Sequence, residues 1–301
     1  MAVITTGSFA KAIYPGLNAI WGQTYNEHQK EYTDLFDVQK SSRNYEEDLG
    51  TSGYGLAPVK AEAGSISFDS EQQTYVSRYT HVVYGIGAII TREMMEDDLY
   101  DVVGGRRTKG LAFSINQTIE TVAANIYNNA FTAGTGGDGS FLCVSTHSTS
   151  AGNQSNILAV AADLSEASLE QMCININNAT NDRGLKIAVM PQTLIVPPTL
   201  AFEAERILKS SLQNDTANNA INALKSNGVL PGGYKVNHYL TDVDAFFIRT
   251  NCPDGLKMFM RRAPAFEMDN DSDTQNAKFM ATVRFVPKWT DFRGLFGSPG
   301  A

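Results

Sequence analysis

The stretch "YGLAPVKAEAGSISFDSEQQTYVSRYTHVVYGIGAII" occupies residues 54–90, and "TREMMEDDLYDVVGGRRTKGLAFSINQTIETVAANIYNNAF" follows at residues 91–131. The first part predicts two extended strands joined by the polar turn "DSEQQ" at residues 69–73. The second part predicts one helix that, if unbroken, is about 60 Å long. A lone two-stranded hairpin is marginal in water and needs a further surface. The pattern therefore indicates a part that lies across a neighbouring copy of the chain, and not a substrate cleft.

The predicted helix has a start signal and one apolar stripe. Thr91 is a good N-cap residue, and the acidic residues that follow it suit the positive end of the helix dipole. Gly104 and Gly105 weaken the middle of the helix, so we expect a split or a bend there. Beyond them, the apolar residues step by three and four and predict a face packed on a core: Leu111, Ile115, Ile119, Val122, Ile126 and Ala130.

The second hairpin strand, predicted over residues 74–84, carries strand formers on both faces. Tyr75, Tyr79 and Val83 share one side, and Val76, Val82 and Tyr84 share the other side with Arg78. Mixed faces fit partners on both sides of the strand, and a packed internal sheet also produces them. Gly85 and Gly87 give backbone freedom near the hairpin base, where a hinge, a bulge or a close packing point accounts for them equally well.

Composition places the chain among folded proteins with a substantial core. Its 301 residues allow about two domains, and its charged content of 19% is ordinary. A net charge of -8 argues against a charge-driven nucleic-acid binder. The start of the chain has no signal-peptide pattern, and no window approaches the 18 or so apolar residues of a membrane span. Three distant cysteines, Cys143, Cys173 and Cys252, indicate buried thiols in a reducing compartment.

The remainder of the chain divides into recognisable segments. Residues 1–53 predict an arm with a short amphipathic helix that docks on other parts of the chain or on other copies. A second helix is predicted at residues 165–178, capped by Asp163 or Ser165, and "QTLIVPP" predicts a buried strand before a third helix. The Asn-rich run at residues 214–233 predicts a mobile loop. The last part predicts strands, of which the longest are an antiparallel pair: "YKVNHYL", "AFFIRT", "LKMFMRRAPAF" and "KFMATVRFVPKW".

Motifs for catalysis or cofactor binding fail on their spacing. The glycine-rich loop "AGTGGDGS" has no lysine after it, so a glycine turn is favoured over a phosphate site. The acidic turn that begins at Asp269 has Thr274 and Met280 where a calcium loop needs Gly and Glu. The four histidines show no metal-ligand spacing, namely His28, His81, His147 and His238. We therefore expect no enzyme, no cofactor and no metal.

A basic cluster lies on the predicted long helix. Arg106, Arg107 and Lys109 in "GGRRTKG" have the charge to face DNA or acidic groups of a neighbour. A solvated face with local ion pairs to Asp97, Asp98 and Asp101 is the favoured interpretation.

The order of these elements resembles a known family. An arm, a long hairpin, a spine helix, a mixed domain and a closing strand follow one another, and the resemblance is carried by "YEEDLGTSGYGLAPVK", "YTHVVYGIGAIITREMMEDDLY", "PQTLIVPP" and "ATVRFVPKWTDFRGLFGSPGA". The chain is similar to tailed-bacteriophage major capsid proteins of the Hong Kong 97-like fold, and among them to Mu-like prophage major head subunits. The fold implied is α+β, with peripheral and axial domains.

The resemblance implies a domain plan and a structural role. The plan has an N-terminal arm (1–53), an extended loop (54–91), a peripheral domain (92–185) with spine helix 92–131, an axial domain (186–262) and a return to the peripheral domain with a tail (263–301). The family forms hexamers and pentamers of an icosahedral shell around double-stranded DNA. Four glycines are then hinge candidates, namely Gly85, Gly87, Gly104 and Gly105. Six residues are candidates for inter-subunit contacts: Phe68, Tyr75, Arg78, Tyr79, Trp21 and Phe36.

The implied partners are further copies of the chain, a portal, separate scaffold or decoration proteins, and DNA contacted without sequence specificity. A separate scaffold is expected because the chain starts almost directly at the arm, unless this sequence is already a mature form. The implied location is the virion capsid, assembled in the host cytoplasm without a membrane. Lys60 is the only lysine of the hairpin and is expected near its base, so we predict no covalent crosslinking. The alternative function is an encapsulin-like nanocompartment shell.

Overall fold

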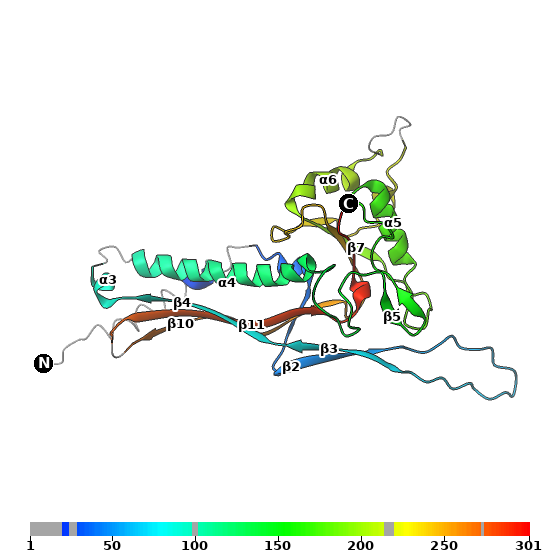
Figure 1. Cartoon of the computed structure of the whole chain (residues 1–301), viewed down its shortest axis with the longest axis horizontal. Coiled ribbons are helices and arrows are strands. Elements are labelled where there is room, and N and C mark those ends of the chain that lie inside the picture. Colours follow the sequence, from blue (N-terminus) through cyan, green and yellow to red (C-terminus); the bar gives the residue numbers. More distant parts are fainter. Residues whose placement is uncertain (1–19, 24–28, 98–101, 214–219, 272–273) are drawn as a thin grey trace.

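The protein has an elongated base, a lobe at one end of it and a long loop that projects past that end (Figure 1). The computed structural model describes residues 20–23, 29–97, 102–213, 220–271 and 274–301. Among the expected features, His28, Asp98, Asp101 and Asp273 lie outside the described residues.

A four-stranded sheet forms the floor of the base. Its order is β1-β10-β11-β4, in which β1 runs parallel to β10 and the other pairs are antiparallel. The antiparallel pair expected near the C-terminus is confirmed and forms the long centre of the sheet. The strands are β1 (Asp37–Lys40), β4 (Val82–Ile90), β10 (Leu256–Asn270) and β11 (Ala277–Trp289).

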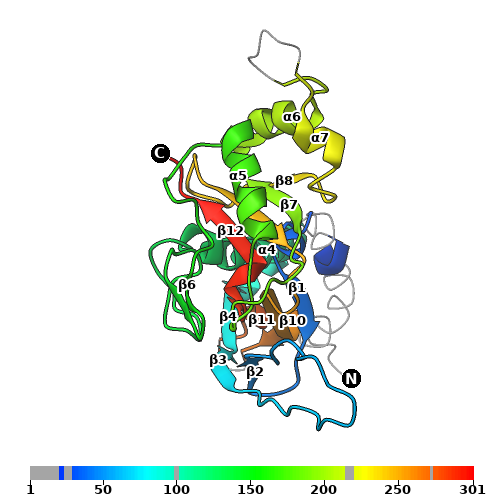
Figure 2. The same ribbon diagram turned by 90° about the vertical axis from the view of Figure 1, so that its right-hand side faces the viewer.

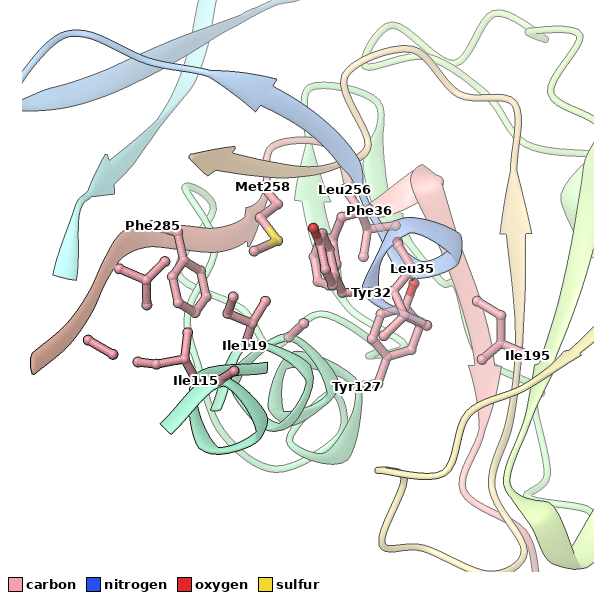
Figure 3. Close-up of a cluster of buried hydrophobic side chains, with 14 of the residues drawn as sticks. Tyr32, Leu35, Phe36, Ile115, Ile119, Tyr127, Ile195, Leu256, Met258 and Phe285 are labelled. Carbon is pink, nitrogen blue, oxygen red and sulfur yellow. Dashed lines mark hydrogen bonds between the residues drawn. The ribbon is translucent and has the colours of Figure 1, made fainter. Parts of the chain in front are cut away.

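The helix α4 (Val102–Asn128) lies along one face of this sheet (Figure 1). Burial alternates along β11, and its fully buried residues include Phe279, Val283 and Phe285. Ile115 and Ile119 of α4 pack into the same core, as Figure 3 shows. The predicted apolar stripe of the helix is therefore confirmed as the surface that holds the helix on the sheet.

The break in the spine lies before the glycines that were expected to cause it. A short helix α3 (Arg92–Glu96) begins at Thr91, whose side chain accepts a hydrogen bond from the Met94 N–H at 3.4 Å, so the predicted N-cap is confirmed. Gly104 and Gly105 are both inside α4. A Cβ on Gly105 would lie 3.6 Å from Cδ1 of Ile20, an ordinary van der Waals contact.

The hairpin starts earlier in the chain than the sequence pattern indicates. Strand β2 (Tyr45–Thr51) pairs antiparallel with β3 (Gln73–Thr80), and residues 52–72 between them form a long loop without strands. The strand expected over residues 54–68 and the tight turn at 69–73 are therefore wrong. Pro58 cannot donate to a strand ladder, and Gly53 has a φ of 66°, so both interrupt pairing. Lys60 lies near the middle of this loop and not at its base.

The second predicted strand divides at His81. β3 stays in the hairpin, whereas β4 leaves it and pairs with β11. A Cβ on Gly85 would lie 3.3 Å from Cγ2 of Thr282, and one on Gly87 would lie 3.0 Å from the Phe279 carbonyl oxygen. These distances support the close-packing interpretation of both glycines.

The lobe is built on a second four-stranded sheet with the order β12-β9-β7-β8 (Figure 2). Successive residues of β7 enter two different cores: Ile195 packs with the base, whereas Leu194 and Val196 pack with the lobe helices. Burial on both faces explains the continuous apolar run "TLIV". The strands are β7 (Pro191–Val196), β8 (Tyr234–Val236), β9 (Phe246–Thr250) and β12 (Leu295–Ser298).

Helices cover the outer face of the lobe sheet. The predicted cap at Ser165 is confirmed, since its side chain and that of Ser168 form a reciprocal capping box at the start of α5. The Asn-rich run is not a loop throughout, because Asn222 caps a short helix within it and Gly228 ends that helix with a φ of 58°. The helices are α5 (Glu166–Asn177), α6 (Ala201–Lys209) and α7 (Ala223–Asn227), with the 3₁₀ turn η1 (Pro198–Leu200) before α6.

A buried asparagine joins the base to the lobe. The Nδ2 of Asn156 donates to the carbonyl oxygens of Leu142 (2.7 Å) and Leu295 (2.9 Å). Its Oδ1 accepts from the Val144 N–H at 2.9 Å and lies 3.2 Å from Nε2 of His147. Asn156 thus satisfies backbone groups of the glycine-turn segment and of β12 that burial would otherwise leave without partners.

We expect Asn156→Ala to lower the free energy of unfolding by about 2–4 kcal/mol, because the substitution leaves several buried backbone groups unpaired. Urea denaturation followed by circular dichroism measures this change. Asn153→Ala, at an exposed position of the short strand β6 (Gly152–Gln154), is the matched control and should have little effect. Equal effects of the two substitutions would contradict the role of Asn156.

Candidate assembly surfaces

The long loop at residues 52–72 exposes large apolar side chains. Val59 is 100% exposed and Phe68 is 94% exposed, and the loop has no core of its own. A cluster of exposed apolar groups on one projecting segment indicates a contact with another surface. The exposed apolar residues of the loop are Tyr54, Leu56, Val59, Ile66 and Phe68.

Polar contacts hold the end of the loop that precedes β3 on the lobe. The guanidinium of Arg183 pairs with the Asp69 carboxylate and donates to the Ser70 carbonyl oxygen at 2.6 Å. The Gly55 N–H also donates to Asp69 at 2.7 Å, which ties the two sides of the loop together. The hydrogen bonds from Arg183 and from the backbone lower the pKa of Asp69 to about 2.

Arg183 belongs to a segment that is itself anchored in the lobe. The preceding residue, Asp182, accepts from Nη2 of Arg293 at 2.7 Å, and both side chains are buried. Arg293 also donates to the Thr180 carbonyl oxygen at 2.8 Å. Within the short segment 180–183, Asp182 therefore contacts buried Arg293 of the lobe, and the next residue, Arg183, contacts the projecting loop.

The hairpin residues divide between core and surface. Tyr79 is fully buried, with its hydroxyl 2.6 Å from Oγ1 of Thr290, and Tyr75 is half-buried with its hydroxyl donating to the Ser148 carbonyl oxygen. Arg78 is exposed and lies over the Tyr45 ring at 3.9 Å. Among the contact candidates, Phe68 and Arg78 therefore have side-chain surface available to a neighbour.

The arm candidates Trp21 and Phe36 lie in the core of their own subunit. Trp21 stacks on Phe266, and Phe36 meets Tyr127 edge to face. Both are almost fully buried, so the apolar stripe of the arm docks on its own chain. Figure 3 shows Phe36 among the side chains of this core. Of the two docking modes left open by the sequence, the structure shows the one within the chain, and these two side chains have little surface left for a neighbour.

A buried carboxylate binds the arm to α4. Glu120 is 3% exposed and accepts hydrogen bonds from the backbone N–H groups of Glu31 (3.0 Å) and Tyr32 (2.8 Å) at the start of α2 (Tyr32–Leu35). The Tyr127 hydroxyl donates to the Leu35 carbonyl oxygen at 2.9 Å. Desolvation raises the pKa of Glu120 to about 7, and the nearby acidic groups Glu31 and Asp34 add to this effect.

The acidic groups around Glu120 have basic side chains as partners on the lobe side. Glu31 lies 2.6 Å from Nδ1 of His238, and Asp34 lies 3.4 Å from Nζ of Lys235. The arm therefore connects the spine helix with the segment around β8.

The β4 strand forms a free edge of the base sheet. It pairs with β11 on one side, and in the described part of the chain no strand pairs with its other side. Several of its apolar side chains are exposed, so the edge is a second surface suited to a neighbour. These side chains are Val82, Val83, Ile86 and Ile89.

The basic cluster of the spine is exposed. Arg106, Arg107 and Lys109 lie on the surface of α4, while Thr108 between them is buried. In the described residues these three side chains have no carboxylate within salt-bridge distance. The expected ion pairs to Asp98 and Asp101 fall outside the described residues.

The residues considered for chemistry lie apart from one another. His81 lies between β3 and β4, His147 pairs with the buried Asp138 at 2.6 Å, and His238 is exposed beside Glu31. In the described part of the chain, no group of three or more His, Cys, Asp or Glu side chains is arranged to hold a metal ion. Burial raises the pKa of the thiols of Cys143, Cys173 and Cys252. None of the described helices is both long and apolar enough to cross a membrane.

Sequence reasoning missed Glu120, Arg183 and the Asp69 contact. A signal existed for Glu120, because it is an acidic residue beside Ile119 on the buried side of the helical stripe. No signal in the sequence pairs Asp69 with Arg183, which lie 114 positions apart.

We expect the free energy of unfolding to fall as the pH rises from about 4.5 to about 7, by about 1.4 kcal/mol for each pKa unit by which Glu120 is raised. The folded chain binds the extra proton in this window, because its Glu120 has the higher pKa. Glu120→Gln should remove this part of the slope in urea titrations at several pH values. Glu71→Gln, at an exposed loop position, should keep the original slope. An unchanged slope in Glu120→Gln would contradict the assignment.

Arg183→Ala should release the loop at residues 52–72 and speed trypsin cleavage at Lys60, the only basic residue in that loop, by about tenfold. Mass spectrometry of limited digests measures the rate of this cut. Arg206→Ala, which breaks the exposed pair with Glu203 on α6, is the control and should leave the rate unchanged. A rate at Lys60 equal to that of the unmodified chain would show that Asp69 and Arg183 do not hold the loop.

Comparisons with known proteins agree with this architecture. The chain resembles a virus-like particle protein from Pyrococcus furiosus with a TM-score of 0.54, 12% identity, and coverage of 94% of this chain and 98% of that one. A structure from Mycobacterium phage Che8 gives a TM-score of 0.54, 14% identity, and coverage of 91% and 93%. The capsid of Myoviridae phage XM1 gives 0.53, 8% identity, and coverage of 91% and 92%. At these identities the likeness establishes the fold alone.

The sequence itself supplies the family. No curated protein shows significant sequence similarity to the chain. The family model described as phage capsid protein matches residues 74–297, which include β4, α4, three complete strands of the lobe sheet and both long strands of the base. The mixed helix and sheet architecture is the Hong Kong 97-like α+β fold expected from the order of the elements. The chain belongs to the phage capsid protein family and is a structural component of the virion capsid.

Proposed function

We propose that this protein is the major head subunit, and that it self-assembles into hexamers and pentamers of an icosahedral shell around double-stranded DNA. The observation that carries the proposal is the projecting loop at residues 52–72, which exposes Val59 and Phe68 to solvent. An apolar segment that its own subunit leaves uncovered is favourable only if another surface covers it. Family membership makes a second copy of the chain the natural source of that surface.

The domain plan expected from the sequence becomes part of this proposal, with the hairpin base moved to β2 and β3. Residues 92–185 and 263–301 form the peripheral domain, and residues 186–262 form the axial domain near the capsomer centre. Support comes from the two cores, since the base core draws on α4, β10 and β11 while the lobe core draws on α5, α6 and β7.

The contacts proposed between subunits use exposed residues. Phe68 on the loop and Arg78 on β3 reach a neighbour, and the β4 edge receives one. Four glycines remain proposed hinges, at which the backbone bends differently in hexamers and in pentamers: Gly85, Gly87, Gly104 and Gly105. The closely packed surroundings of Gly85 and Gly87 favour small adjustments over a wide hinge.

Further partners belong to the same proposal. A portal, and separate scaffold or decoration proteins, act with the shell during assembly in the host cytoplasm. The exposed cluster of Arg106, Arg107 and Lys109 contacts packaged DNA or an acidic neighbour without sequence specificity. The role is structural, and we propose no catalytic activity.

A nanocompartment shell is the second candidate function. The observation that favours it is the likeness to a virus-like particle protein from Pyrococcus furiosus. The two functions differ in what the shell encloses, so the nucleic acid content of particles separates them.

We expect the purified protein to form closed shells tens of nanometres across, visible by negative-stain electron microscopy. Shells from infected or induced cells should contain DNA that nuclease degrades only after the shells are opened. Particles filled with protein and free of DNA would support the nanocompartment. A small oligomer of uniform size at every concentration and salt condition would contradict both functions.

Replacing residues 56–68 with Gly-Gly should leave the subunit folded but unable to close shells, because this removes exposed loop without touching the β2–β3 pairing. The melting temperature should stay within a few degrees of that of the full chain, while electron microscopy should show only free subunits or capsomers. Normal shells from this variant would contradict the loop's role in assembly.

A further inference from the structure

A group of arginines gathers on the face of the base sheet that α4 does not cover. Nη1 of Arg261 and Nη2 of Arg284 both donate to Oδ1 of Asn44, at 3.3 Å and 3.2 Å. Arg262 is exposed and stands opposite Arg284 in the β10–β11 register. Two guanidinium groups from neighbouring strands thus share one neutral side chain, and a third arginine stands beside them in the register.

A bulge in β10 creates this arrangement. Met260 pairs with Phe285 and Arg262 pairs with Arg284, so Arg261 is an extra residue on the β10 side. Bulges of this kind redirect a side chain and recur at functional places in sheets. Here the bulge presents two consecutive arginines, where a regular strand would send them to opposite faces.

A buried histidine forms the wall of the site. Nε2 of His81 lies 3.0 Å from Oγ of Ser41, and this hydroxyl donates to Glu46 at 2.7 Å. Ser41 therefore accepts from His81, and its position next to β10 is held by a backbone bond to Met260. Burial together with Arg284 and Arg261 lowers the pKa of His81, which favours the neutral imidazole and so adds no further positive charge beside the arginines.

Among the residues that the structure describes, the three arginines have no carboxylate paired with them. In the described part of the chain, neither Arg261, Arg262 nor Arg284 has a carboxylate within salt-bridge distance, and the buried Nε of Arg284 has no hydrogen-bond acceptor. Glu46 is already engaged by Ser41 and by Arg43, the latter at 3.6 Å. Grouped and partly buried cations are costly unless an anion pairs with them.

We propose that Arg261, Arg262 and Arg284 form a receptor for a carboxylate side chain from a second copy of the chain. Guanidinium groups bind carboxylates through paired N–H donors, and Asn44 holds two of the three groups ready. The inference rests on the proposed self-assembly and adds a specific contact to it.

A second copy of the chain suits this site because it is negatively charged overall and provides exposed carboxylates. The chain carries a net charge of -8, so an identical neighbour presents a surface rich in carboxylates. The projecting loop alone carries exposed acidic residues, among them Glu62 and Glu71, for which the described residues show no ion pair. Complementary charge of this kind sets the register between subunits more than it sets their affinity.

Arg261→Lys combined with a zero-length carbodiimide coupling reagent tests this contact. Lysine keeps the positive charge and supplies an amine that couples to a carboxylate in direct contact. Shells co-assembled from equal amounts of ¹⁵N-labelled and unlabelled chains should give coupled peptides at residue 261 with one heavy and one light partner. Unassembled subunits should give none. Arg206→Lys is the control for the reagent, because it should couple to its own Glu203 in both samples.

Two results would overturn the inference. Coupling at residue 261 only to Glu46 of the same chain would show that the subunit supplies its own anion. Absence of coupling at residue 261, with the control reaction complete, would show that no carboxylate reaches the site. If the Arg261→Lys shells also retained a different amount of DNA from the unmodified shells, the site would be assigned to nucleic acid. Unmodified chains that form no shells would instead remove the proposed function, so the two failures are distinguishable.

Arg284→Gln gives a second measurement. It should raise the subunit concentration at half-assembly by about tenfold, which corresponds to about 1.4 kcal/mol, and should weaken the salt dependence of assembly. Its melting temperature should match that of the unmodified chain, because the lost partner of Arg284 is the exposed Asn44. Assembly at the original concentration with the original salt dependence would contradict the proposed contact.

Discussion

The fold depends on a match of length between one helix and one strand pair. The 27 residues of α4 span about 40 Å, and the apolar stripe that begins at Leu111 and continues to Tyr127 is favourable in water only when it is covered. The 13 residues of β11 span about 43 Å, and their buried side chains alternate along the whole strand. The pairing of α4 with β11 and β10 therefore makes the base long and thin.

The lobe sheet contributes side chains to both cores at the point where the lobe meets the base. Ile195 and Phe247 face the base core, while their neighbours on β7 and β9 face the lobe helices. The arm closes this junction with Phe36, and Glu120 on α4 binds its backbone. A shift of the arm would therefore disturb the spine and the lobe together, which links the ionisation of Glu120 to the shape of the whole subunit.

The surfaces proposed for assembly share a physical character. The loop at residues 52–72, the β4 edge and the group around Arg284 each leave something unsatisfied in the single subunit: apolar area, strand hydrogen bonds or positive charge. Each lies on an element that other parts of the subunit hold in place. Arg183 holds the loop, and the core between α4 and the base sheet supports the other two surfaces. A rigid subunit with such surfaces is suited to repeated contacts with copies of itself.

The sequence by itself determined the features that depend on nearby residues: the Thr91 and Ser165 caps, the stripe of α4, the long final strands and the order of elements that identifies the fold. Only the tertiary structure decided which strands pair. Local pattern read residues 54–84 as one hairpin, but β3 pairs with β2 and β4 pairs with β11, almost 200 positions away. The contacts of Asp69, Glu120 and Arg284 were equally beyond local pattern, because their energies come from partners brought near by folding and by the exclusion of water around them.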